Sequence, residues 1–138
     1  MMRAATLVLL LALFGCAEEP GPPLVASDIE ITRPMAGMDM SAGYLTLKNN
    51  TGTAIVVTQV QSPQFARVEI HETTIEDGIS KMRALDSLTV PANGAARLER
   101  GGKHLMLMQA RDLKDSVTLQ FMSGDALLLS VQYRFDPT

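Results

Sequence analysis

The chain has 138 residues, of which 46% are hydrophobic, 4% aromatic and 20% charged, and its net charge is −3. This mild acidity gives no reason to expect a nucleic acid or an anionic membrane surface as a partner. With one cysteine, the chain forms no internal disulfide and lacks the cysteine pair that thiol–disulfide exchange needs, so the fold must rest on a hydrophobic core.

The start of the chain resembles an export signal. Arg3 precedes an apolar run from Ala4 to Phe14, which is shorter than the about 20 residues of a transmembrane helix. The run ends in Leu13-Phe14-Gly15-Cys16, which resembles a bacterial lipobox. We therefore expect residues 1–15 to be a lipoprotein-type signal peptide and Cys16 to be lipidated, anchoring the exported protein on the periplasmic side of a bacterial membrane. The alternative is an ordinary signal peptide with an incidental cysteine.

The segment after the cysteine is acidic and rich in proline. We expect residues 16–27 to form an extended tether that joins no core. Residues 28–138 then have the size of one domain.

Beyond the tether, the sequence consists of short alternating or β-branched segments separated by turn residues. The expected strands lie at residues 43–49, 54–60, 67–71, 88–91, 104–108, 117–121 and 127–135. Asp77-Gly78, Asn93-Gly94 and Ser123-Gly124-Asp125 are typical of hairpin turns. No segment past residue 24 keeps the spacing of an amphipathic helix beyond a turn or two.

This pattern predicts an all-β fold, an antiparallel sandwich or barrel in a single domain. The core should consist of leucine, isoleucine and valine side chains with Phe121, Tyr133 and Phe135, because the chain has no tryptophan.

The segment 67–71 places a histidine opposite its apolar residues. Val68 and Ile70 share one face of the strand, so His71 lies on the other face with Arg67 and Glu69.

The segment 104–108 alternates in the same way, and two methionines lie on the same face as its histidine. Leu105 and Leu107 share one face, and His104, Met106 and Met108 share the other. If the leucines point into the core, an exposed imidazole and two thioethers have no evident folding role. Imidazole and thioether ligands together select Cu(I) over harder divalent ions. A strand buried on both faces would instead make these residues core fillers, and periodicity leaves both interpretations open.

The sequence lacks the residues that other kinds of site need. A blue-copper site needs a cysteine thiolate, and Cys16 precedes the domain. The sequence contains no nucleophile-elbow pattern and no phosphate-binding glycine loop.

The spacing of four of these residues is specific. His71, Met82, His104 and Met106 form the pattern H-x10-M-x21-H-x-M, which resembles the signature of the PCu(A)C family of periplasmic copper chaperones. The segments 43–49 and 101–107 are also similar to the family's early strand and its Gly-Gly-x-His-Leu-Met segment. The resemblance covers most of residues 42–133.

The resemblance implies a cupredoxin-like β-sandwich without the cupredoxin copper site. It implies that His71, Met82, His104 and Met106 bind Cu(I). It also implies a non-enzymatic carrier that delivers copper to the binuclear centre of a cytochrome oxidase, either to the oxidase subunit or to its assembly factors.

Further methionines lie outside the motif, among them Met38, Met40 and Met108. We expect Met38 to be a loop residue, whereas Met40 and Met108 are either a second, weaker copper contact or loop residues. Two other functions remain open: a periplasmic lipoprotein used as a binding module, with copper storage or tolerance or no metal role, and a copper-dependent redox enzyme. A site closed by four soft ligands leaves no evident substrate position, which disfavours the enzyme.

Overall fold

The computed structural model describes residues 19–137, so the expected signal peptide and Cys16 lie outside the described residues. Within that range the chain forms eleven β-strands. They are β1 (Leu24–Ile31), β2 (Met40–Asn49), β3 (Ile55–Val57), β4 (Gln59–Gln61), β5 (Phe65–Glu76), β6 (Ile79–Leu85), β7 (Leu88–Val90), β8 (Ala95–Leu98), β9 (Lys103–Ala110), β10 (Ser116–Ser123) and β11 (Ala126–Arg134). No helix among the described residues is long and apolar enough to cross a membrane.

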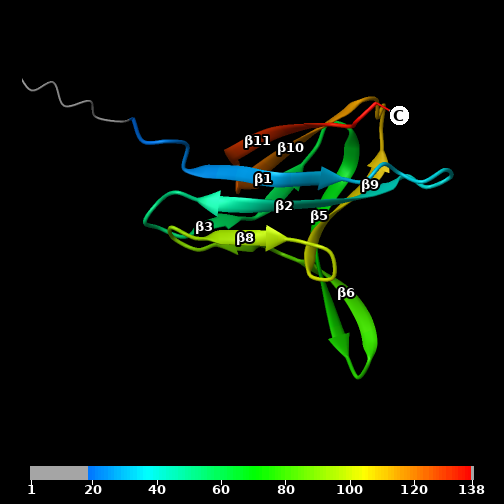
Figure 1. Ribbon diagram of the computed structural model, residues 1–138, viewed down its shortest axis with the longest axis horizontal. Coiled ribbons are helices and arrows are strands. Elements are labelled where there is room, and N and C mark those ends of the chain that lie inside the picture. The colour runs from blue at the N-terminus through cyan, green and yellow to red at the C-terminus, as the bar shows by residue number, and fades with distance from the viewer. Residues whose placement is uncertain (1–18, 138) are drawn as a thin grey trace, which may run out of the picture.

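Antiparallel pairing joins most of these strands into one curved sheet. Its order is β1-β2-β9-β5-β4-β10-β11, with β6 added to β5 and β8 added to β2, and β3 and β7 form a separate ribbon. The two ends of the path, β1 and β11, lie against each other, so the sheet nearly closes on itself (Figure 1). The predicted all-β antiparallel fold is confirmed.

Alternating side chains fill the interior of this nearly closed sheet. Leu45 and Leu47 from β2, Leu107 from β9 and Phe121 from β10 are at most 2% exposed. Phe135 is also buried, and the other expected aromatic residue, the tyrosine of β11, packs against the core from a partly exposed position. The core is therefore mainly aliphatic, as the composition predicted, and it contains three phenylalanines, the expected Phe121 and Phe135 together with Phe65.

The fold begins earlier than the sequence analysis placed it. Residues 24–27, expected at the end of the tether, form the first half of β1 and pair with β2. Leu24 is 1% exposed, so the sheet itself holds this segment. The register shifts between Ser27 and Glu30, and Asp28 has a φ of 52°. This bulge interrupts the apolar alternation that would otherwise have revealed a strand.

One expected strand and one expected hairpin turn also differ from their expected role. The segment 54–60 is divided at Thr58, so that β3 pairs with β7 while β4 joins the main sheet. The chain does turn at Asn93, where φ is 52°, but the flanking strands do not pair: β7 pairs with β3 and β8 with β2. A turn sequence specifies local backbone angles, whereas the strand partners are chosen by burial.

The hairpin of β5 and β6 projects from the body of the molecule (Figure 1). Asp77 and Gly78 have φ values of 52° and 76°, which are the positive angles of a two-residue hairpin turn. Every residue of β6 up to Ala84 is exposed. The half of β5 that pairs with β6 therefore extends past the core, and β6 lies in solvent.

Candidate metal centre

The pairing of β5 with β9 brings the two histidines together. His71 lies directly opposite His104 in the antiparallel register, and opposite residues share a face of the sheet. Their ring centroids are 5.9 Å apart with an edge-on orientation. Two imidazoles distant in sequence therefore become neighbours on one sheet face.

Strand alternation decides which face this is. Leu105 and Leu107 are 0% exposed and point into the core, so His104, Met106 and Met108 lie on the outer face of β9. The expectation of an exposed imidazole was wrong, because His104 is only 6% exposed. Alternation gives the face of a residue but not what covers that face.

The cover comes from β2 and from the loop before β9. The ring of Tyr44 lies 6.5 Å from that of His104, and the Arg100 guanidinium stacks 4.5 Å from the centre of the Tyr44 ring. Arg100 also forms an ion pair with Glu30, which compensates its charge. The sequence analysis did not identify Tyr44, Arg100 or Glu30, since their meeting depends on how three strands are arranged.

The third expected ligand comes from the projecting hairpin. Met82 lies opposite Thr73, which is two residues after His71 and shares its face. A hollow of about 380 Å³ is lined by Met82, His104 and Met106, with Ala42, Tyr44, Thr73, Ser80, Arg100 and Gly101. His71 is not part of this wall and lies beside it, against His104. Three of the four motif residues thus line one hollow. The fourth, His71, lies next to the hollow because its ring is beside that of His104.

Hydrogen bonds determine which nitrogen of each histidine carries a proton. Nδ1 of His104 lies 3.1 Å from the carbonyl oxygen of Gly102. A carbonyl oxygen only accepts, so this nitrogen donates its proton and leaves Nε2 with a lone pair.

His71 has the opposite arrangement. Its Nε2 lies 2.8 Å from Oε2 of Glu69, and a carboxylate accepts, so Nε2 is the donor. The lone pair of the neutral ring is then on Nδ1, which is buried and has no hydrogen-bond partner among the described residues. A buried acceptor without a partner costs about 1–3 kcal/mol. A metal ion bound at Nδ1 would remove that cost.

Glu69 is held in its charged form by the same contacts. The hydrogen bond from His71 lowers the pKa of Glu69, partial burial opposes this, and the nearby charge of Arg67 lowers it further. The Arg67 Nε atom lies 3.1 Å from Oε1 of Glu69. A carboxylate that accepts from a histidine orients the ring for metal binding. Glu69 could have been found from its position two residues before His71 on the same face.

The donor set is soft. Two imidazole nitrogens and the thioethers of Met82 and Met106 are available around the hollow, whereas no group of three or more His, Cys, Asp or Glu side chains suited to a metal ion occurs within residues 19–137. Uncharged nitrogen and thioether sulfur suit Cu(I).

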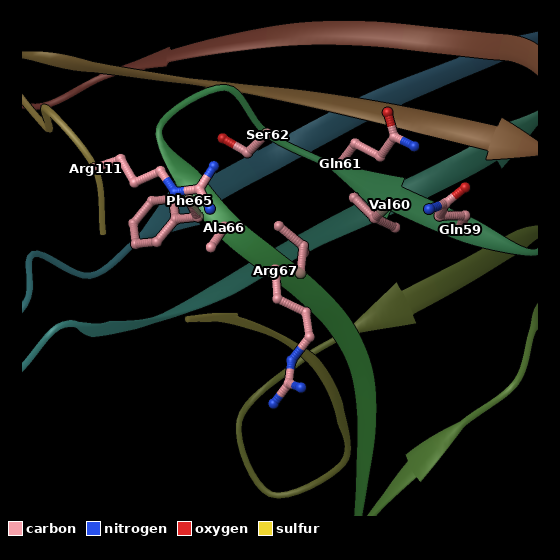
Figure 2. Close-up of a pocket in the computed structure, with 9 residues that line it drawn as sticks. Gln59, Val60, Gln61, Ser62, Phe65, Ala66, Arg67 and Arg111 are labelled. Atoms are coloured by element: carbon pink, nitrogen blue, oxygen red, sulfur yellow. The ribbon is translucent and has the colours of Figure 1, made fainter. Parts of the chain in front are cut away.

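A second depression lies along β4 and the start of β5. Figure 2 shows Gln61, Ser62, Phe65 and Arg111 around it, with Arg67 at its lower edge. Its lining residues include no histidine, methionine or cysteine. It offers hydrogen-bonding groups and cations and no soft ligand.

Comparison with known proteins agrees with the fold. The family described as "Putative lipoprotein LpqE-like" matches residues 24–132. No curated protein matches the sequence. Among solved structures, the copper-bound PCuAC domain from PmoF2 is 13% identical with a TM-score of 0.65, covering 84% of this chain and 94% of that one.

A bacterial protein of higher identity has been solved in two states. Apo-DR1885 from Deinococcus radiodurans is 25% identical with a TM-score of 0.60, covering 100% of this chain and 95% of that one. Its Cu(I) form is 28% identical with a TM-score of 0.57, covering 86% and 80%. The fold is thus the cupredoxin-like fold of PCuAC domains, and by the match over residues 24–132 the chain belongs to the LpqE-like family.

Proposed function

We propose that this protein is a Cu(I) carrier that holds its ion with His71, Met82, His104 and Met106. The observation that carries the proposal is the cross-strand histidine pair, in which Nδ1 of His71 is buried without a partner and Nε2 of His104 is left free by the bond to Gly102. An imidazole binds metal through such a lone pair, in its neutral form.

The ligand types support Cu(I) as the cargo. Thioether sulfur is a poor ligand for hard divalent ions and a good one for Cu(I). DR1885, which shares the fold, has been solved with Cu(I). Met82 is 55% exposed, so an acceptor can approach one ligand without unfolding the domain. That accessibility suits a protein that passes its ion on rather than one that retains it.

The destination follows from the family resemblance. Copper would be delivered to the binuclear centre of a cytochrome oxidase, either to the subunit that holds it or to an assembly factor. Lipidation of Cys16 would keep the carrier on the periplasmic side of the membrane, near such acceptors. If Cys16 is the anchor, Cys16→Ser releases the protein from the membrane fraction or stalls its processing. A mature N-terminus at another residue would contradict this.

The test of the copper centre is a Cu(I) titration against a competing chelator, with X-ray absorption of the loaded protein. We expect one tight equivalent with both nitrogen and sulfur ligands. Met82→Leu and Met106→Leu keep the side-chain volume and remove the sulfur, so each should weaken binding at least tenfold, about 1.4 kcal/mol.

Met122→Leu is the matched control, because Met122 lies on β10 and outside the motif. The four-residue centre is wrong if both motif variants bind Cu(I) as tightly as the parent. In that case the protein is better described as a lipoprotein binding module whose motif histidines and methionines have no metal role.

A further inference from the structure

A second pair of thioethers lies on the same outer face as the proposed centre. Met40, at the start of β2, is directly opposite Met108 of β9 in the antiparallel register. Directly opposite Cβ atoms are about 4.5–5.5 Å apart. Methionine has a long unbranched side chain, so two such arms can bring both sulfurs onto one ion.

These thioethers are presented outward rather than packed into the core. Met40 is 39% exposed, and the core side of the two strands is occupied by Ser41 and Leu107, which are 3% and 0% exposed. The guanidinium of Arg67 lies 3.6 Å from the sulfur of Met108 and donates to it. A sulfur lone pair is therefore directed to the outer face, where a soft ion would bind in place of the guanidinium.

The positive charge of Arg67 does not prevent a cation from binding at the Met40–Met108 pair. Its side chain is 64% exposed and is paired with Glu69 at 3.1 Å. The contact to Glu69 is made by Nε and that to the sulfur by Nη2, so the guanidinium can leave the sulfur and keep its ion pair. The thioethers then provide two neutral soft ligands, the type that selects a monovalent soft ion.

The pair is one strand repeat away from the proposed centre. Met108 follows Met106 by two residues on the same face, a separation of about 7 Å along a strand. Exposure rises from Met106, which is half-buried, to Met40 at 39% and Met38 at 47%. A soft ion that binds at the exposed pair is therefore a short step from a site that also offers imidazole nitrogen.

We propose that Met40 and Met108 form a second, weaker soft-ion site for Cu(I), positioned to load the four-residue centre from solvent. The loading role rests on the proposed four-residue centre, whereas binding at the pair does not, because its ligands are different side chains. It is weaker because it lacks the two histidines.

The test follows each methionine methyl group separately. The full chain with Cys16→Ser, which removes its one cysteine, is labelled with 13C-methyl methionine in detergent micelles. It is titrated with Ag(I), a soft monovalent ion without redox chemistry, and then with Cu(I). We expect the Met82 and Met106 signals to move with the first equivalent, the Met40 and Met108 signals with the second, and Met122 with neither.

Met108→Leu should abolish the second phase and leave the first unchanged. The proposal is overturned if the Met40 and Met108 signals stay still through two equivalents, if they move together with the first, or if the second phase survives in Met108→Leu. If Met82 and Met106 stay still while Met40 and Met108 move, the four-residue centre fails and the thioether pair stands.

Discussion

Replacing Glu69 tests whether the charge behind His71 matters for copper. The perturbation is Glu69→Gln, which keeps the shape and an acceptor oxygen but removes the negative charge. In the parent, the 2.8 Å contact between His71 Nε2 and Glu69 Oε2 has the length of a charge-assisted hydrogen bond. That bond keeps the proton on Nε2, so the lone pair stays on the buried Nδ1.

The size of the effect follows from the surroundings of the carboxylate. Loss of a group that orients a metal-ligating histidine typically costs 10–100-fold in affinity, about 1.4–2.7 kcal/mol. The Glu69 side chain is 32% exposed, so water screens part of its charge. We therefore expect the low end of that range, about tenfold weaker Cu(I) binding by chelator competition.

Glu72→Gln is the matched control for this substitution. Glu72 lies on the same strand with the opposite facing, and it pairs with Arg83 at 3.2 Å and Lys103 at 3.7 Å. Both variants change the net charge equally, so a long-range effect would weaken copper binding in both. Only Glu69→Gln should also change the 15N signals of His71, which report the ring tautomer, while those of His104 stay unchanged. Equal losses of affinity in the two variants would refute the reasoning.

Three further predictions follow from the structure. Copper affinity should fall as the pH is lowered from about 7 to about 5, because protons compete with Cu(I) for the imidazole nitrogens of His71 and His104, and a flat profile would exclude both as ligands. Because the pKa of Glu69 is lowered below its ordinary value of 4.5, its contribution to folding is present above that value and is lost as the pH falls through the lowered pKa. In acid titrations of stability, Glu69→Gln should remove this loss and Glu72→Gln should not. Asn49 is 0% exposed and its side chain forms four hydrogen bonds, so Asn49→Ala should cost about 2–3 kcal/mol in urea unfolding, and a cost under about 1 would contradict this.

The strand pattern of the sequence was sufficient to predict the fold class and the face of the strand on which each site residue lies. Leu105 and Leu107 alternate with His104 and Met106 because β9 is buried on one side, and that period can be read without a structure. β1, β6 and β8 were missed, and β6 shows no alternating burial because its residues are exposed up to Ala84. β1 contains a bulge at Asp28, and β8 carries alanines in place of larger apolar residues.

The centre itself was predicted only through the resemblance. Nothing local to either strand specifies that His71 faces His104, because the register between β5 and β9 is set by the whole sheet. The burial of His104 was missed for the same reason, since Tyr44 reaches it from β2. Glu69 was visible in the strand pattern, but its role required the distance to His71.

The four proposed ligands are not held equally firmly, because one of them lies on the projecting hairpin. His71, His104 and Met106 lie on strands that the core backs, whereas Met82 lies on β6, whose residues are exposed up to Ala84. A two-stranded ribbon without a packed face opens more easily than the strands of a core. Among the ligands of a bound ion, Met82 should therefore dissociate most often. The three-coordinate ion left behind would have one open position facing solvent, where an incoming ligand can attach before the next bond breaks. Copper transfer would then proceed by stepwise ligand exchange, at a rate set by the opening of the ribbon rather than by unfolding of the domain.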